Sequence, residues 1–436
     1  MDINLSTLVT GREVSLKDML DAREHRQEVQ RMLLSEHHLP VISFTLNIVG
    51  PVKVFPLALR TFHEGIRLIE TQCHAWKIPI IATYSTTSHT GHEYFWAVDG
   101  DARFIKENLC LLEDSVALGR LFDIDVIQTD GMKISRTDLG FSTRKCLICN
   151  QEAFVCSRAR THSVKELLEQ ECQIMTNYFA KQHARKLSSL SMQALVYEVS
   201  VTPKPGLVDR NNTGAHQDMD IFTFEASAVS LNHYFEQFAL CGIENGHEPF
   251  SRIFSRLRSL GYMYANHIPY SPDTLLKINR KLVADVLEDF NDVTVENART
   301  NGERLYALYG MKGARGEALS GYHTVLKKAL PVLKHQLDRG LSLNDAGAVT
   351  LLYIMAHSED TNIVNRSSYH SMKKIQALLR ETLNDPEFIN KDPIPYIESL
   401  DREFIKNNIS PGGSADLLAL TFFLYLFENS GLSSIL

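Results

Sequence analysis

The sequence has no long hydrophobic run and no surplus of positive charge. Its most apolar stretch, residues 417–427, is shorter than the roughly 20 residues that a transmembrane helix needs. The chain has 45 Lys and Arg residues and 52 Asp and Glu residues, which gives a net charge of −7. This negative charge argues against a nucleic-acid-binding surface. The first 16 residues lack a basic segment followed by an apolar one. We therefore expect a cytoplasmic protein with neither nucleic acid nor membrane as a partner.

Cysteine is also scarce. Seven cysteines, an odd number without a secretion signal, predict thiols or metal ligands rather than a disulfide framework. The P-loop motif G-x-x-x-x-G-K-[ST] is missing, and so is a Pro/Ser/Gly-rich linker. Any phosphate site must be built in another way, and the domain boundary must be inferred from a change in hydrophobic period.

That period changes once along the chain. In the N-terminal part, expected helices at 15–36, 60–77 and 101–117 alternate with expected strands at 41–51, 78–85, 93–100 and 122–128. Ser15 and Asp18 predict a capping box at the first of these helices. Nearly every later segment has a period near 3.6. The sequence therefore predicts a multi-domain protein, with an α/β or α+β domain over residues 1–174 and a larger all-α domain over residues 175–436.

Two acidic residues interrupt the expected strand FDIDVI at residues 122–127. Side chains alternate along a strand, so Asp123 and Asp125 face the same side. Neighbouring carboxylates repel each other unless a cation lies between them, and they suit Mg²⁺, which also binds substrate phosphates. A solvated face at a sheet edge explains the pair equally well. Asp99 and Asp130 are possible third carboxylates, and spacing does not choose between them.

A cysteine-rich segment, KCLICNQEAFVCSRARTHS, follows at residues 145–163. Cys146, Cys149, Cys156 and His162 could form a Cys₃His zinc site, or they could be reduced thiols in a compact loop, because the segment has only one C-x-x-C. Interleaved basic residues suit a diphosphate or an acidic protein partner: Arg144, Lys145, Arg158 and Arg160.

Polar, glycine-containing segments separate the helices expected in the C-terminal part, at residues 201–220, 309–319, 357–366 and 410–420. Such loops are more often functional than idle. Glycines let backbone amides approach an anion, and a helix N-terminus favours phosphate. Together the four loops predict a polyphosphate site. Single residues also have structural interpretations, with Asp218 as a helix cap and Asp416 in the first turn of its helix.

The motifs in these segments match known families. VTPKPGLVDRNNTGAHQDMD, DTNIVNR and SPGGSADLLAL resemble the triphosphoribosyl-dephospho-coenzyme A synthase family. GREVSLKDMLDAREHRQ, LGRLFDIDVI and RKCLICNQEAFVC resemble the apo-citrate lyase phosphoribosyl-dephospho-coenzyme A transferases, or holo-citrate lyase synthases. The resemblance covers nearly the whole chain and implies a fusion, with the transferase domain first and the synthase domain second.

The resemblance implies two reactions. The synthase joins ATP to 3′-dephospho-coenzyme A, whose 2′-hydroxyl displaces adenine. The transferase then attaches phosphoribosyl-dephospho-coenzyme A to a serine of the acyl carrier protein subunit of citrate lyase and releases pyrophosphate. ATP and 3′-dephospho-coenzyme A are thus the implied substrates, with Mg²⁺ as the expected cofactor and Zn²⁺ as a possible one.

The resemblance also guides the choice of site residues. Displacement of adenine needs a base and a carboxylate near the sugar, and the triphosphate needs a cationic clamp. We expect catalytic roles for Asp123, Asp125, Asp218 and Asp360, and metal binding by Asp123, Asp125 and Asp220. Residues expected to bind the substrates are Lys204, Asp209, Asn211, His216, Lys312, Arg315, Asn362, Arg366, Gly412, Gly413, Ser414 and Asp416.

Two other functions remain open from the sequence. The equivalent enzymes of malonate decarboxylase make and install the same prosthetic group, although the cysteine-rich segment favours the citrate lyase branch. A non-catalytic protein that docks the carrier or binds the coenzyme would leave Asp123 and Asp125 on a wet strand face.

Overall fold

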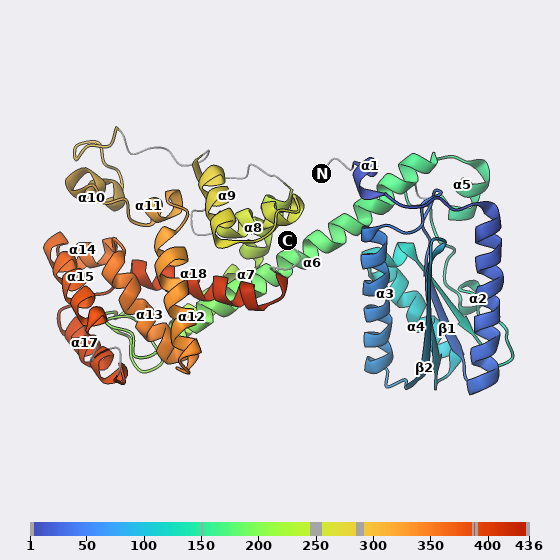
Figure 1. The fold of residues 1–436 in the computed structure, drawn as a ribbon, viewed down its shortest axis with the longest axis horizontal. Helices are drawn as coiled ribbons and strands as arrows, with labels where there is room; N and C mark the ends of the chain where they lie inside the picture. Colours follow the sequence, from blue (N-terminus) through green and yellow to red (C-terminus); the bar gives the residue numbers. More distant parts are fainter. Residues whose placement is uncertain are drawn as a thin grey trace. The chain divides into compact units, whose positions relative to one another are not determined.

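The computed structural model describes residues 4–149, 151–244, 255–284, 292–385, 388 and 391–432. The chain divides into two compact units, Met1–Phe179 and Ala180–Leu436, and the division falls inside helix α6 (Val164–Ser200). The described part of the first unit contains a four-stranded sheet, and that of the second contains helices and their connections but no strand (Figure 1). The predicted fold, an α/β or α+β part followed by a larger all-α part, is confirmed.

The sheet has the strand order β2-β3-β1-β4, and every neighbouring pair is antiparallel. The elements that build and cover it are α2 (Leu16–His37), β1 (Val41–Leu46), α3 (Pro56–Ala75), β2 (Ile80–Ser88), β3 (Gly91–Val98), α4 (Ala102–Ser115) and β4 (Phe122–Ile127). From β1 onward, this β-α-β-β-α-β order with its antiparallel sheet is the ferredoxin-like topology. Of the two predicted classes, the N-terminal unit is therefore α+β.

Helices cover both faces of this sheet. On one face α3 and α4 pack over a core that includes the fully buried Phe44 and Trp96. On the other face α2 places Val29 and Leu33 against Phe95 (Figure 1). Shorter helices complete the unit before α6: α1 (Leu5–Leu8), η1 (Ala117–Leu121), η2 (Thr137–Leu139) and α5 (Ala153–Ala159).

The C-terminal unit is organised around two apolar helices, α13 (Leu343–His357) and α18 (Gly412–Asn429), which contact each other. Both bury residues around most of their circumference, as central helices do. The other described elements are α7 (Ile221–Ile243), α8 (Ser255–Ala265), α9 (Pro272–Ala284), α10 (Asn301–Tyr309), α11 (Gly313–Leu319), η4 (Val325–Ala329), α12 (Leu330–Asp338), α14 (Thr361–Arg366), α15 (Tyr369–Asn384) and α17 (Ile394–Lys406). None of the described helices is long and apolar enough to cross a membrane.

Candidate active sites

The acidic face of β4 is partly covered by helix α2. β4 is an edge strand that pairs with β1, placing Asp123 opposite Thr45 and Asp125 opposite Ser43. Helix α2 lies over this face, where Gln30 donates a hydrogen bond to the Ser43 hydroxyl at 3.0 Å. Both carboxylates are consequently half-buried.

The two carboxylates have different surroundings. Asp125 forms an ion pair with Lys133, whereas Asp123 lines a pocket of about 140 Å³ and has no hydrogen-bond or ion-pair partner within the described ranges. Neither Asp99 nor Asp130 joins them, because among the described residues the cysteine cluster is the only set of three or more potential ligands close enough to share a metal ion. Asp123 is therefore the member of the pair that faces an open space.

The pocket around Asp123 has cationic walls. Arg23 and Arg26 of α2 line it together with Lys53, and Arg26 also pairs with Glu93 at 2.6 Å. Burial lowers the pKa of Lys53, while Glu171 nearby opposes this shift. A pocket that combines cations with one available carboxylate suits a phosphate group and its metal ion.

His92 also lines this pocket, and no sequence motif had marked it. Its Nδ1 lies 3.3 Å from the Thr87 hydroxyl, and its buried Nε2 has no hydrogen-bond partner among the described residues. Burial, reinforced by His63, lowers the pKa of His92 and so favours the neutral form of the ring. It can therefore accept a proton within the pocket.

In the C-terminal unit, the four predicted loops meet at the N-termini of α14 and α18. Asp360 caps α14 and accepts hydrogen bonds from Ser414 of α18. The amide of Lys312 donates to Glu359 at 3.0 Å, and His216 contacts Ser410 at 2.9 Å. Segments separated by up to 194 residues thus form one cluster.

His216 connects two of these loops. Arg366 can only donate, so its contact with the His216 Nδ1 at 3.1 Å makes Nδ1 the acceptor, and the Nε2–H then donates to Ser410. Burial lowers the pKa of His216, and the positive charge of Arg366 lowers it further by a smaller amount. Arg366 also binds the Ala215 carbonyl at 2.9 Å. His216 and Arg366 therefore hold the loops together.

Lys204 and Asp209 are engaged inside the protein. Lys204 is 2 % exposed and donates to the carbonyl and the carboxylate of Glu198, at 2.9 and 2.5 Å. Asp209 is buried and accepts hydrogen bonds from Thr202 and from the amide of Asn211. The predicted role of Lys204 in binding phosphate therefore has no support from its position, because its ammonium group already pairs with Glu198.

Two expected helix positions were wrong. The cap of α7 is Asp220 rather than Asp218, and Asp220 forms a capping box with Thr223. Asp218 is exposed. Helix α18 begins at Gly412, so Asp416 is its fifth residue rather than part of the first turn. Asp220 therefore uses its carboxylate locally, and Asp416 does not compensate the helix dipole.

Asp416 has the most unusual environment of these carboxylates. Part of the Asp416 side chain is exposed to solvent, but many protein atoms surround its carboxylate and reduce its solvation. This desolvation, followed by the charges of Glu198 and Asp360, raises the pKa of Asp416 to about 7. A carboxylate with such a pKa can exchange a proton near neutral pH.

The two glycines at the start of α18 allow a close approach to α14. A Cβ on Gly412 would lie 2.5 Å from the Asn362 amide nitrogen, and one on Gly413 would lie 3.3 Å from the Asp360 carboxylate. The Ser414 amide, expected to bind phosphate, already donates to Asp360 at 2.7 Å. The remaining substrate candidates lie at the surface or half-buried: Asn211, Lys312, Arg315 and Asn362.

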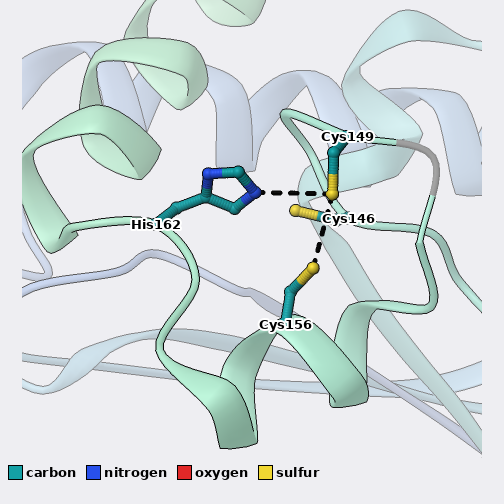
Figure 2. Close-up of side chains that lie close together, drawn as sticks. All are labelled: Cys146, Cys149, Cys156 and His162. Atoms are coloured by element: carbon teal, nitrogen blue, oxygen red, sulfur yellow. Dashed lines mark hydrogen bonds between the residues drawn. The ribbon is translucent and has the colours of Figure 1, made fainter.

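The sulfur atoms of Cys146, Cys149 and Cys156 and the ring of His162 point toward one another (Figure 2). Their potential ligand atoms all lie within 4.8 Å of one another. The Cys149 sulfur is 3.4 Å from that of Cys156 and 3.4 Å from the His162 Nε2. The structure thus brings together all four residues of the predicted cluster. The neighbouring Arg144 is not open to a ligand phosphate, since it pairs with Glu113 at 2.7 Å.

Comparison with known proteins identifies both units. Residues 14–178 match the family model of apo-citrate lyase phosphoribosyl-dephospho-CoA transferase, CitX. Residues 184–268 and 269–434 match that of ATP:dephospho-CoA triphosphoribosyl transferase, CitG. The protein is therefore a two-part transferase. The chain belongs to the CitXG family, with a CitX domain followed by a CitG domain.

Similar proteins cover the chain from end to end. It is 30% identical to Protein CitXG of Haemophilus influenzae, over 96% of this chain and 98% of that protein. It is also 30% identical to Protein CitXG of Leuconostoc mesenteroides subsp. cremoris, over 95% and 97% respectively. A 2-(5''-triphosphoribosyl)-3'-dephosphocoenzyme-A synthase of Haemophilus ducreyi is 32% identical over 63% of this chain and 98% of its own.

Proposed function

We propose that this chain makes and installs the prosthetic group of citrate lyase in two consecutive steps. The C-terminal unit joins ATP to 3′-dephospho-coenzyme A and releases adenine. The N-terminal unit transfers phosphoribosyl-dephospho-coenzyme A to a serine of the apo acyl carrier protein subunit and releases pyrophosphate. One observation carries the proposal: each unit matches one transferase family and assembles its own group of charged and proton-exchanging side chains.

In the first step the 2′-hydroxyl oxygen of dephospho-coenzyme A bonds to C1′ of the ATP ribose, and the bond from C1′ to adenine breaks. The hydroxyl loses a proton and adenine gains one. Asp416 is suited to accept the hydroxyl proton, because its pKa of about 7 keeps it partly ionised at neutral pH. Asp360 is instead a positioning residue, since its buried carboxylate already accepts hydrogen bonds from α14 and α18.

The triphosphate needs cations and amide donors. Lys312 is exposed, and Arg315 follows it in α11. The amides of Gly412 and Gly413 have no hydrogen-bond partner among the described residues, which leaves them available at the N-terminus of α18. Mg²⁺ would enter with ATP and neutralise phosphate charge. Asp218 is the exposed carboxylate beside His216 and is the candidate ligand on this unit.

In the second step a serine hydroxyl oxygen bonds to a phosphorus atom as the bond to pyrophosphate breaks. Asp123 would hold Mg²⁺ near the phosphates, and Arg23 and Lys53, which line the same pocket, would add positive charge. Asp125 would bind the metal ion only if its ion pair with Lys133 were broken. The neutral His92 is the candidate acceptor of the serine proton.

The first test supplies the purified full chain with ATP, Mg²⁺ and 3′-dephospho-coenzyme A. We expect adenine and the triphosphoribosyl product in equal amounts, measured by chromatography and mass spectrometry. Adenine formation that does not depend on dephospho-coenzyme A, or no adenine at all, would rule out the synthase step.

The second test adds an apo acyl carrier protein and follows its mass. We expect the apo acyl carrier protein of citrate lyase to gain the mass of one phosphoribosyl-dephospho-coenzyme A while pyrophosphate is released. The apo carrier of malonate decarboxylase is the competing acceptor. Preference for that carrier would assign the chain to the other system, and modification of neither carrier, with the pre-formed triphosphoribosyl substrate supplied, would reject the transfer step alone.

A further inference from the structure

We propose that the N-terminal unit binds one structural Zn²⁺ through the sulfur atoms of Cys146, Cys149 and Cys156 and the Nε2 of His162. Neither proposed reaction uses this ion, so the site goes beyond the proposed function. Three thiolates and one imidazole form a complete tetrahedral set. With no position left for water, the site is of the structural kind rather than the catalytic kind.

The observed spacing fits zinc. With Zn–S bonds of about 2.3 Å, tetrahedral geometry separates two sulfur ligands by roughly 3.8 Å. The distance from the Cys149 sulfur to that of Cys156 is 3.4 Å, and all four potential ligand atoms lie within 4.8 Å of one another. A disulfide would need sulfur atoms about 2.05 Å apart, and it would leave the third thiol and the imidazole without a role.

Backbone contacts and a short helix position these ligands. The segment carrying Cys146 and Cys149 folds back on itself, with the Cys146 amide donating to the Gln151 carbonyl at 2.8 Å. Cys156 comes from the short helix α5, and His162 follows that helix directly.

This segment also holds the start of β4. Arg120 donates to the Lys145 carbonyl and, at 3.1 Å, to the Cys146 carbonyl. Arg144 donates to the Phe122 carbonyl at 2.6 Å, one residue before Asp123. Zinc binding would thus fix the segment against the strand that presents Asp123.

The direct test is the metal content of the full chain. The protein is purified under reducing conditions, incubated with ZnSO₄ and desalted, and its zinc is then measured by mass spectrometry. We expect about one Zn²⁺ per chain, falling at least fivefold in Cys149→Ser. Cys241→Ser is the matched control, because Cys241 is a half-buried thiol of the C-terminal unit, and it should keep the metal.

Cobalt gives a second measurement that does not depend on activity. Co²⁺ bound in place of Zn²⁺ should give the intense visible absorption of a tetrahedral site with thiolate ligands, and Cys149→Ser should lose it. Zinc below about one tenth per chain after incubation, together with no such cobalt spectrum, would overturn the proposal. Equal zinc in Cys149→Ser and wild type would also overturn it.

A third measurement separates this proposal from the proposed function. The two tryptophans, Trp76 and Trp96, both lie in the N-terminal unit, so their fluorescence follows the unfolding of that unit. Cys149→Ser should lower its unfolding midpoint in urea, while Cys241→Ser should not. This result and the zinc content do not require that either reaction occurs.

Discussion

The carboxylate of Asp360 accepts two hydrogen bonds from Ser414, one from its amide at 2.7 Å and one from its hydroxyl at 2.8 Å. The same carboxylate accepts hydrogen bonds from the amides of Asn362 and Ile363, at 3.0 and 3.3 Å. It therefore caps α14 and at the same time joins that helix to the N-terminus of α18. Because Asp360 is 1 % exposed, water cannot replace these contacts.

The first prediction concerns this junction. Asp360→Asn replaces one acceptor oxygen with an NH₂ donor that faces other donors, so we expect the C-terminal unit to lose about 2–3 kcal/mol of stability and adenine release to fall steeply. Circular dichroism reports the helices of both units, and tryptophan fluorescence reports the N-terminal unit alone, so a transition seen only by circular dichroism belongs to the C-terminal unit. Asp101→Asn is the control, since Asp101 is an exposed cap with one backbone bond, to Phe104 at 2.7 Å. Equal effects of the two substitutions would contradict the role of Asp360.

The second prediction distinguishes an ion pair from a phosphate ligand at Lys204. Lys204→Met leaves Glu198 buried without its partner, which should cost about 3–5 kcal/mol. The double variant Lys204→Met, Glu198→Leu should recover most of that loss and restore adenine release at an unchanged KM for ATP. A KM that stays raised at least tenfold in the well-folded double variant would instead assign Lys204 to the triphosphate.

The third prediction separates the two activities. Asp123→Asn should slow pyrophosphate release by at least about 100-fold, because it removes the available carboxylate of the pocket, and should leave adenine release unchanged. Asp99→Asn, an exposed carboxylate after β3, is the matched control. If Asp123→Asn transferred the prosthetic group at the wild-type rate, Asp123 would have only a structural role.

The fourth prediction concerns pH. If Asp416 accepts the hydroxyl proton, adenine release should rise as pH passes through about 7 and reach a plateau above it, because the base must be ionised. Asp416→Asn should lose most of the activity, and the remaining rate should lack this rise. A residual rate that still rises near pH 7 would place the base elsewhere.

Stability gives an independent check on Asp416. Its folded pKa of about 7 lies above the ordinary value of 3.8, so between about pH 4 and 7 the unfolded chain loses this proton first. The free energy of unfolding therefore falls as pH rises through this window. Asp416→Asn should remove that dependence and be more stable than wild type at pH 8, measured by urea unfolding with circular dichroism. A variant less stable at pH 8 than wild type would contradict the raised pKa.

Much of the fold could be predicted from local patterns. The capping box of Ser15 and Asp18 forms as expected, since its partners are three residues apart. The strands, the change to an all-helical pattern and the cluster of Cys146 to His162 also depend on short spacings. The sequence left open whether the first unit was α/β or α+β, because strand pairing joins segments far apart along the chain.

The sequence by itself determined which segments hold clusters of polar or metal-ligating side chains: the acidic strand, the cysteine cluster and the four loops of the helical unit. The tertiary structure decided which side chains in them remain available. Lys204 pairs with Glu198 and Asp360 accepts hydrogen bonds from Ser414, whereas Asp123 lines a pocket and Asp416 stays exposed. The physical reason is that a buried polar group must find a partner, and such partners often lie far away in the sequence, as Asp360 and Ser414 do at 54 residues.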